Sequence, residues 1–219
     1  IPEKVSMQED KVSIKNLTPQ EDNAVRNTLS FLIFLDSMQV NNLPNISDHL
    51  TDPSVKFLIN IQQFQEVIHT QSYQYVLEAL YPFLERESIY NLWRDNPLLL
   101  KRNKFIADQY QSFIDEPNEV NFKKVMVANY CLEGVYFYSG FNLFEQLASR
   151  EKLTQTAKII KYIKTDENNH LKLFEHLLKE LIDYEEDAAW VSEAIDMAVE
   201  QEIEWAKETY GEGILGISK

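Results

Sequence analysis

The stretch Gln65-Glu-Val-Ile-His-Thr-Gln-Ser-Tyr73 places a carboxylate, an imidazole and a phenol along one side of a predicted helix. Glu66 and His69 are three residues apart and therefore share a helix face, and Tyr73 lies one turn further on. This arrangement of ionisable groups decides how the rest of the chain is interpreted.

Apolar residues in the same segment predict that this face belongs to the core. We expect Ile61, Phe64 and Ile68 to mark the packed side of the helix. Buried charges are costly and persist only when they are paired or bound to a metal ion. The polar residues therefore need a partner inside the protein.

A second copy of the motif supports a metal ion as that partner. Glu167 and His170 repeat the Glu-x-x-His spacing within TDENNH, residues 165–170. Each copy also follows a helix with a single acid in strongly apolar surroundings. Asp36 precedes Glu66 by 30 residues, and Glu133 precedes Glu167 by 34. One such match would be weak, whereas two at similar spacing are specific.

Four carboxylates and two histidines form the ligand set of carboxylate-bridged dinuclear helical bundles. Mixed oxygen and imidazole ligands suit iron or manganese. The ligands alone leave ferroxidase, oxygenase, desaturase and radical-generating functions open. His49 and His176 lack this context, and we expect both at the surface or its edge.

Composition favours an all-α fold in one domain spanning residues 1–219. The chain contains only 5 Gly and 7 Pro, and no segment alternates convincingly as a strand. Residues 1–17 are predicted to form an irregular N-terminal arm. Thr18-Pro19 and Thr51-Asp52-Pro53 are helix-start signals. The predicted helices are 18–40, 51–81, two within 86–114, 120–148, 152–183 and 187–209, with breaks at 41–45 and 95–97 and a stop at Gly211 and Gly213.

Charge and cysteine content restrict partners and location. The formal net charge of −14 argues against nucleic acid or an anionic membrane as a partner. The single cysteine, Cys131, excludes an internal disulfide framework and fits a reducing cytoplasm. We expect no membrane span, because no apolar run reaches about 18 residues. The N-terminus also lacks the pattern of a signal peptide.

Around these motifs the sequence resembles the small, radical-generating (beta) subunit of class I ribonucleotide reductase, whose fold is a ferritin-like helical bundle with additional helices. The resemblance extends from Pro2-Glu-Lys-Val5 to Gly213-Ile-Leu-Gly216. It is carried by the stretches LDSMQ at 35–39, EVIHTQSY at 66–73, LEGVYF at 132–137 and KIIKYIKTDENNH at 158–170.

The resemblance implies a role for each matching residue. Asp36, Glu66 and His69 would ligate one metal ion, and Glu133, Glu167 and His170 the other, with Glu66 and Glu167 bridging or approaching both. Tyr73 would carry a tyrosyl radical, which would be shielded by the apolar residues Phe137, Phe141 and Ile163. Asp166 would hydrogen-bond His69 and lie on the electron-transfer path. Gln62 either hydrogen-bonds a ligating carboxylate or fills space.

The function implied is that of ribonucleoside-diphosphate reductase, acting only with a separate alpha subunit. Two iron ions, two manganese ions or a mixed pair would react with dioxygen or a derived oxidant. The oxidising equivalent, held on Tyr73 or on the metals, would pass to alpha for ribonucleotide reduction. Family members are homodimers, and a flavoprotein activator is left open. An oxidase acting on a bound ligand and a metal-storage protein are the alternatives.

Two departures from the family pattern accompany the resemblance. The family has a tryptophan just before the segment that matches Ile1-Pro2-Glu3, and it continues past Lys219 with further helices and a tail that docks on alpha. We expect the 219 residues to assemble the metal site without supporting turnover.

Overall fold

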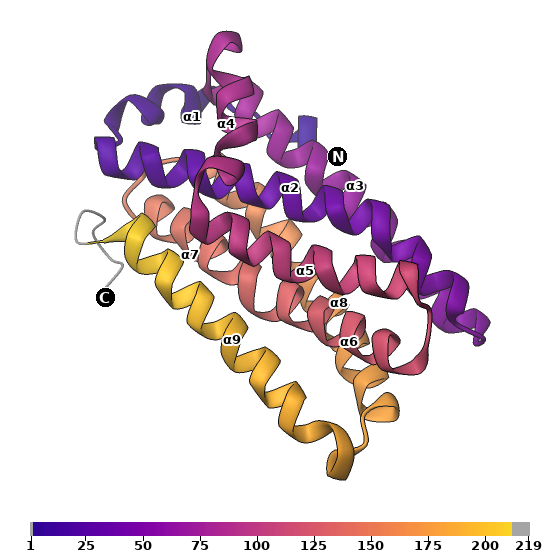
Figure 1. Cartoon of the computed structure of the whole chain (residues 1–219). Helices are drawn as coiled ribbons and strands as arrows, with labels where there is room; N and C mark the ends of the chain where they lie inside the picture. The colour runs from indigo at the N-terminus through magenta and orange to yellow at the C-terminus, as the bar shows by residue number, and fades with distance from the viewer. Residues whose placement is uncertain (1, 212–219) are drawn as a thin grey trace.

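A computed structural model describes residues 2–211 of the chain (Figure 1). Its two longest N-terminal helices begin at side-chain caps that the sequence predicts. Thr18 caps α2 (Pro19–His49): its side chain accepts the Glu21 N–H, while the Glu21 carboxylate accepts the Thr18 N–H. Asp52 caps α3 (Pro53–Leu80) through the N–H groups of Ser54 and Val55. Both helices begin with proline, whose missing N–H would have had no partner there.

Within residues 2–211 every regular element is helical, which confirms the all-α prediction. The other elements are η1 (Pro2–Lys4), α1 (Gln8–Ser13), η2 (Ile14–Asn16), α4 (Phe83–Asp95), α5 (Pro97–Asp115), α6 (Glu119–Cys131), η3 (Leu132–Tyr136), α7 (Phe137–Ala148), α8 (Thr154–Leu181) and α9 (Tyr184–Tyr210).

Four long rods surround the core. They are α2, α3, the continuous rod α6–η3–α7, and α8, and they contact one another in adjacent pairs. Helices α4 and α5 pack on α2, and α9 runs along the outer edge of the bundle against α5 and α6 (Figure 1). The predicted bundle with additional helices is confirmed, and its centre is where the inward acids lie.

The predicted break at residues 41–45 is wrong, because α2 continues through Pro44 to His49. Proline lacks the N–H that would bond the carbonyl four residues earlier, here that of Val40. The side chain of Gln63 on α3 replaces it, donating from Nε2 to the Val40 oxygen at 3.0 Å. A bond from a neighbouring helix therefore keeps α2 continuous.

The N-terminal segment is also more ordered than the predicted irregular arm. It forms η1, α1 and η2, and the buried Asp10 carboxylate accepts the N–H groups of Gln155 at 3.0 Å and Thr156 at 2.6 Å. These are free N–H groups in the first turn of α8. A helix cap that is remote in sequence thus ties the segment to the bundle.

Two apolar residues predicted for the core face outward instead. Ile61 and Phe64 are 54% and 65% exposed, and with Phe57 and Leu58 they form an apolar stripe on the outer side of α3. Glu66 and Tyr73, on the opposite side of the helix, are fully buried. The polar residues, and not the apolar ones, mark the inward face here.

The remaining boundaries differ in smaller ways. Helix α9 begins at Tyr184, three residues before the predicted start, because Asp183 caps it. Gly211 follows α9 with φ of +48°, a conformation that favours glycine. Gly213 lies outside the described residues. In the described range, no helix is both long and apolar enough to cross a membrane.

Candidate metal centre

Six side chains predicted as ligands converge at the centre of the bundle, and each is at most 3% exposed. Asp36 comes from α2, Glu66 and His69 from α3, Glu133 from η3, and Glu167 and His170 from α8. They form two groups whose ligand atoms lie within 4.8 Å of one another, Asp36–Glu66–His69–Glu167 and Glu66–Glu133–Glu167–His170. Glu66 and Glu167 belong to both groups, as two bridging carboxylates would.

A local irregularity presents Glu133. The predicted helix 120–148 contains a π-helical turn, η3, with Glu133 inside it. The sequence pattern did not reveal this turn. Such turns insert an extra residue into a helix and occur often at functional sites.

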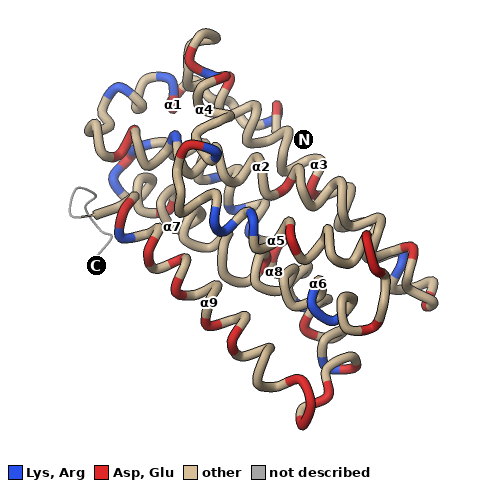
Figure 2. Tube along the Cα trace, viewed as in Figure 1, with Lys and Arg blue, Asp and Glu red and all other residues tan. Residues whose placement is uncertain are grey.

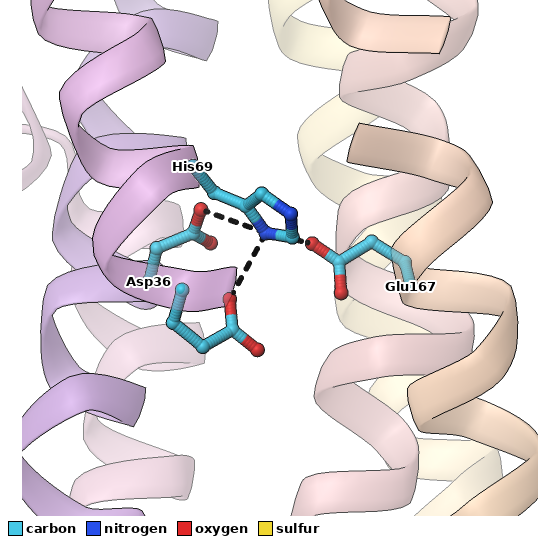
Figure 3. Close-up of side chains that lie close together, drawn as sticks. Asp36, His69 and Glu167 are labelled. Carbon is cyan, nitrogen blue, oxygen red and sulfur yellow. Dashed lines mark hydrogen bonds and ion pairs between the residues drawn. The ribbon is translucent and has the colours of Figure 1, made fainter. Parts of the chain in front are cut away.

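His69 faces three carboxylates with one ring nitrogen. Its Nδ1 lies 3.0 Å from Glu167 Oε1, 3.2 Å from Glu66 Oε2 and 3.9 Å from Asp36 Oδ2. Figure 3 shows the ring between Asp36 and Glu167, which reach it from opposite sides. This nitrogen and the surrounding carboxylate oxygens are close enough together to bind one cation.

His170 has matching surroundings in the other group. Its Nδ1 lies 2.7 Å from Glu167 Oε2, 3.2 Å from Glu66 Oε1 and 3.6 Å from Glu133 Oε2. The two imidazole centroids are 6.0 Å apart. The two halves therefore share Glu66 and Glu167 between a pair of histidines.

The cluster is electrostatically unfavourable without a cation. Burial, with the charges of Glu66 and Glu167, raises the pKa of Asp36 well above its usual value, and burial with Glu167 and Glu66 does the same for Glu133. Burial alone would lower the pKa of His69, but Glu167 and the hydrogen bonds to Asp166 and Glu66 outweigh it and raise that pKa. Protons would thus compensate the carboxylates where metal ions are absent.

The donor set fits a pair of metal ions. Both oxygens of Asp36 and Oε2 of Glu133 are buried and accept no hydrogen bond from the residues described. Buried carboxylate oxygens are normally satisfied. Hard oxygen donors with one imidazole per group suit divalent iron or manganese. The chain thus offers a dinuclear site.

The outer nitrogen of each histidine has its own partner. His69 Nε2 lies 3.2 Å from Asp166 Oδ2, the partner that the family resemblance implied, and His170 Nε2 lies 3.0 Å from Gln65 Oε1. Sequence reasoning missed Gln65, because the contact crosses from α3 to α8 and no local spacing reveals it. Such partners orient a ligating imidazole and select its tautomer.

Two glutamines contact the ligand carboxylates. Gln62 Nε2 donates to Glu133 Oε1 at 2.7 Å and approaches Glu66 Oε1 at 3.4 Å, so Gln62 hydrogen-bonds these carboxylates rather than only filling space. Gln39 Nε2 donates to the same Glu133 oxygen at 2.8 Å and was missed. Its position three residues after Asp36, on the same helix face, is a signal that could have found it.

Tyr73 lies on the same buried face of α3. It is 0% exposed, and its hydroxyl has no hydrogen-bond partner within residues 2–211. Burial and the nearby charge of Asp36 raise the pKa of Tyr73 well above its usual value. Phe137, Phe141 and Ile163 are also buried, and the two phenylalanine rings have centroids 5.9 Å apart.

A cavity of about 390 Å³ reaches the centre from outside. Its lining includes His69, Asp166, Ser72 and Lys158. The Asp166 side chain is 35% exposed, so it connects the buried His69 with this cavity. Elsewhere, His49 and His176 are exposed as predicted, and acidic residues follow the outer helix α9 (Figure 2).

Comparisons with known proteins agree with this geometry. A family model described as ribonucleotide reductase, small chain, matches residues 1–219. The ribonucleoside-diphosphate reductase subunit beta of Treponema pallidum is 41% identical over 226 residues, which cover all of this chain and 64% of that protein. The chain therefore spans less than two thirds of that relative.

Two solved structures of ribonucleotide reductase proteins are similar to nearly the whole chain. The ribonucleotide reductase R2 subunit from Clostridium botulinum is 45% identical with a TM-score of 0.94, covering 100% of this chain and 71% of that one. A putative class I ribonucleotide reductase from Bacillus halodurans is 35% identical with a TM-score of 0.96, covering 99% and 80% respectively.

Proposed function

The chain belongs to the small-chain family of ribonucleotide reductases, and on that premise we propose that it is the radical-generating beta subunit of ribonucleoside-diphosphate reductase. The observation that carries the proposal is the buried cluster of four carboxylates and two histidines, in two groups that share Glu66 and Glu167. The relatives that are 35–45% identical carry reductase names, and these names do not favour the alternatives of a ligand-binding oxidase or a metal-storage protein.

The cluster is proposed to hold two ions of iron, two of manganese, or one of each. Asp36, Glu66 and His69 would bind one, and Glu133, Glu167 and His170 the other. When bound and treated with dioxygen or a derived oxidant, such a pair supplies a one-electron oxidant. Asp166 and Gln65 keep the outer nitrogen of each histidine occupied, which leaves Nδ1 for the metal.

Tyr73 is the proposed site of the radical. Its burial, its lack of a hydrogen-bond partner among residues 2–211 and its nearness to Asp36 support this role. The raised pKa keeps the proton on the phenol oxygen until an electron is removed. Phe137, Phe141 and Ile163 are proposed to exclude water and reductants from the ring.

Asp166 is proposed to connect the centre electronically with the surface. It touches His69 Nε2 and lines the cavity that opens beside it, and both contacts support this role. The oxidising equivalent would pass by this route to a cysteine of a separate alpha subunit, which reduces ribonucleotides. The reaction supplies precursors of DNA, and we propose the cytoplasm as its location.

A homodimer is proposed to cover the apolar stripe of Phe57, Leu58, Ile61 and Phe64 on α3. Exposed contiguous apolar surface of this kind commonly marks an interface. Metal loading with and without a reduced flavoprotein tests whether an activator takes part. Sedimentation distinguishes a dimer from the cage expected of a storage protein.

Two measurements on metal-loaded protein test the function. Electron paramagnetic resonance after aerobic loading should give a tyrosyl signal that Tyr73→Phe abolishes without loss of bound metal. Metal analysis should give two ions per chain for the wild type and fewer for His170→Ala. His176→Ala removes an exposed histidine from the same helix and should retain both ions. Two ions per chain in His170→Ala would refute the assigned site.

A further inference from the structure

Three buried side chains form a closed ring of hydrogen bonds, and one of them, Gln39, also donates to Glu133. Tyr110 donates its hydroxyl to Gln39 Oε1 at 2.7 Å, Gln39 Nε2 donates to Asn129 Oδ1 at 2.6 Å, and Asn129 Nδ2 donates back to the Tyr110 oxygen. The three side chains come from α5, α2 and α6, and each is at most 1% exposed. A ring linking three helices at the centre of the bundle is fixed by packing as well as by hydrogen bonds.

The Glu133 carboxylate determines the direction of every bond in the ring. When a metal ion is bound, the Glu133 carboxylate is ionised and only accepts, so Gln39 points Nε2 at it. Gln39 Oε1 then needs a donor, which is the Tyr110 hydroxyl, and the Tyr110 oxygen takes its own donor from Asn129. Reversing either amide would set two donors or two acceptors against each other.

The two oxygens of Glu133 have different hydrogen-bond partners. Oε1 accepts from both Gln39 and Gln62, at 2.8 and 2.7 Å, from helices α2 and α3. Oε2 accepts no hydrogen bond from the described residues and lies 3.6 Å from His170 Nδ1. One oxygen is therefore anchored by the protein and the other is available.

The acid on the other side of the centre is not held in this way. Both oxygens of Asp36 lack a hydrogen-bond donor among residues 2–211. The protein thus holds one terminal carboxylate of the centre with two hydrogen bonds and makes none to the other. Both acids are fully buried, so burial alone does not produce this difference.

We propose that Gln39, held in place by Tyr110 and Asn129, is a positioning residue that makes Glu133 present only Oε2 to the metal ion on the His170 side. The inference rests on the proposed function, because it assumes that a metal pair binds there. Tyr110 acts at a distance, through Gln39, and touches no ligand atom.

The test compares two tyrosine variants loaded with Mn²⁺ alone. Tyr110→Phe removes the hydroxyl that orients Gln39. Tyr136→Phe is the matched control, since its buried hydroxyl also donates to a glutamine, Gln201 Oε1, at 2.9 Å, but Gln201 lies outside the cluster. Both variants should lose similar thermal stability. Only Tyr110→Phe should weaken binding of one of the two ions, by about tenfold, and shift the infrared carboxylate stretches of the loaded protein.

A double variant tests whether Tyr110 acts through Gln39. Gln39→Met should weaken binding at least as much as Tyr110→Phe, and adding Tyr110→Phe to Gln39→Met should weaken it no further. Equal Mn²⁺ affinity and unchanged carboxylate stretches in Tyr110→Phe would overturn the proposal. So would additive losses in the double variant. If Gln39→Met does not fold, the comparison of Tyr110→Phe with Tyr136→Phe decides alone. Failure of the wild type to bind a metal pair would instead refute the proposed function.

Discussion

The Gln65 amide oxygen lies 3.0 Å from Nε2 of His170, whereas the corresponding partner of His69 is the carboxylate of Asp166 at 3.2 Å. The two halves of the centre are therefore unequal beyond their ligands. A carboxylate partner increases the basicity of a ligating imidazole, while a neutral amide mainly fixes its orientation and tautomer.

Replacing Gln65 should weaken metal binding on the His170 side. Gln65→Met removes the acceptor, and we expect a loss of about 10- to 100-fold in affinity for one ion. A titration with Mn²⁺ measures this loss when the electron paramagnetic resonance signal of the unbound ion is monitored. Gln71→Met, an exposed change on the same helix, should have no effect. Equal losses in the two variants would show that Gln65 does not orient His170.

Metal affinity should fall as pH falls. Without metal the pKa values of His69, His170, Asp36 and Glu133 are all raised, so these groups keep their protons to higher pH than they would in the unfolded chain. Binding needs neutral imidazoles and ionised carboxylates, and it must release those protons. Calorimetry in buffers of different ionisation enthalpy should show net proton release.

The same pKa shifts determine how the stability of the metal-free fold changes with pH. A raised histidine pKa stabilises the metal-free fold fully below the unfolded value of about 6.5, and this contribution is lost as pH rises through the folded pKa. For Asp36 and Glu133, a raised pKa costs stability as pH rises above about 4. The increase in melting temperature on adding Mn²⁺ should therefore grow from about pH 6 to 8. A constant increase would contradict the assigned protonation.

Gln63 should stabilise α2 through the Val40 carbonyl. Gln63→Leu leaves that oxygen without its 3.0 Å partner and should cost about 1 kcal/mol of unfolding free energy. Chemical denaturation measures the loss. In a Pro44→Ala background the new N–H can bond the Val40 oxygen, so Gln63→Leu should then cost much less. The same cost in both backgrounds would mean that the side chain acts in another way.

Two glycines should tolerate alanine differently. A Cβ at Gly140 would lie 3.0 Å from Thr28 Cγ2 and 3.2 Å from the buried ring of Phe31. We expect overpacking of about 1–3 kcal/mol, partly offset by a gain of about 1 kcal/mol in helix propensity. At Gly134 the Cβ would meet only the end of Leu171, which can rotate away. Thermal unfolding should therefore show a larger loss for Gly140→Ala than for Gly134→Ala.

The sequence by itself determined most of the long helices and the six side chains of the candidate metal centre. Caps such as Thr18 and Asp52 act within one turn, and Glu-x-x-His places two side chains on one face, so both can be read from local spacing. Two copies of that motif, each preceded by an inward acid, were enough to predict six side chains that the fold brings together.

Only the tertiary structure decided how those side chains are held. The partners of His170, Val40 and Glu133 are Gln65, Gln63 and Gln39, each on a different helix from its partner. Hydrogen-bond partners separated by long stretches of chain leave no periodic signal along it. The outward direction of Ile61 and Phe64 was hidden for a related reason. Hydropathy shows that a face is apolar, but the packing of neighbouring helices decides whether that face is covered.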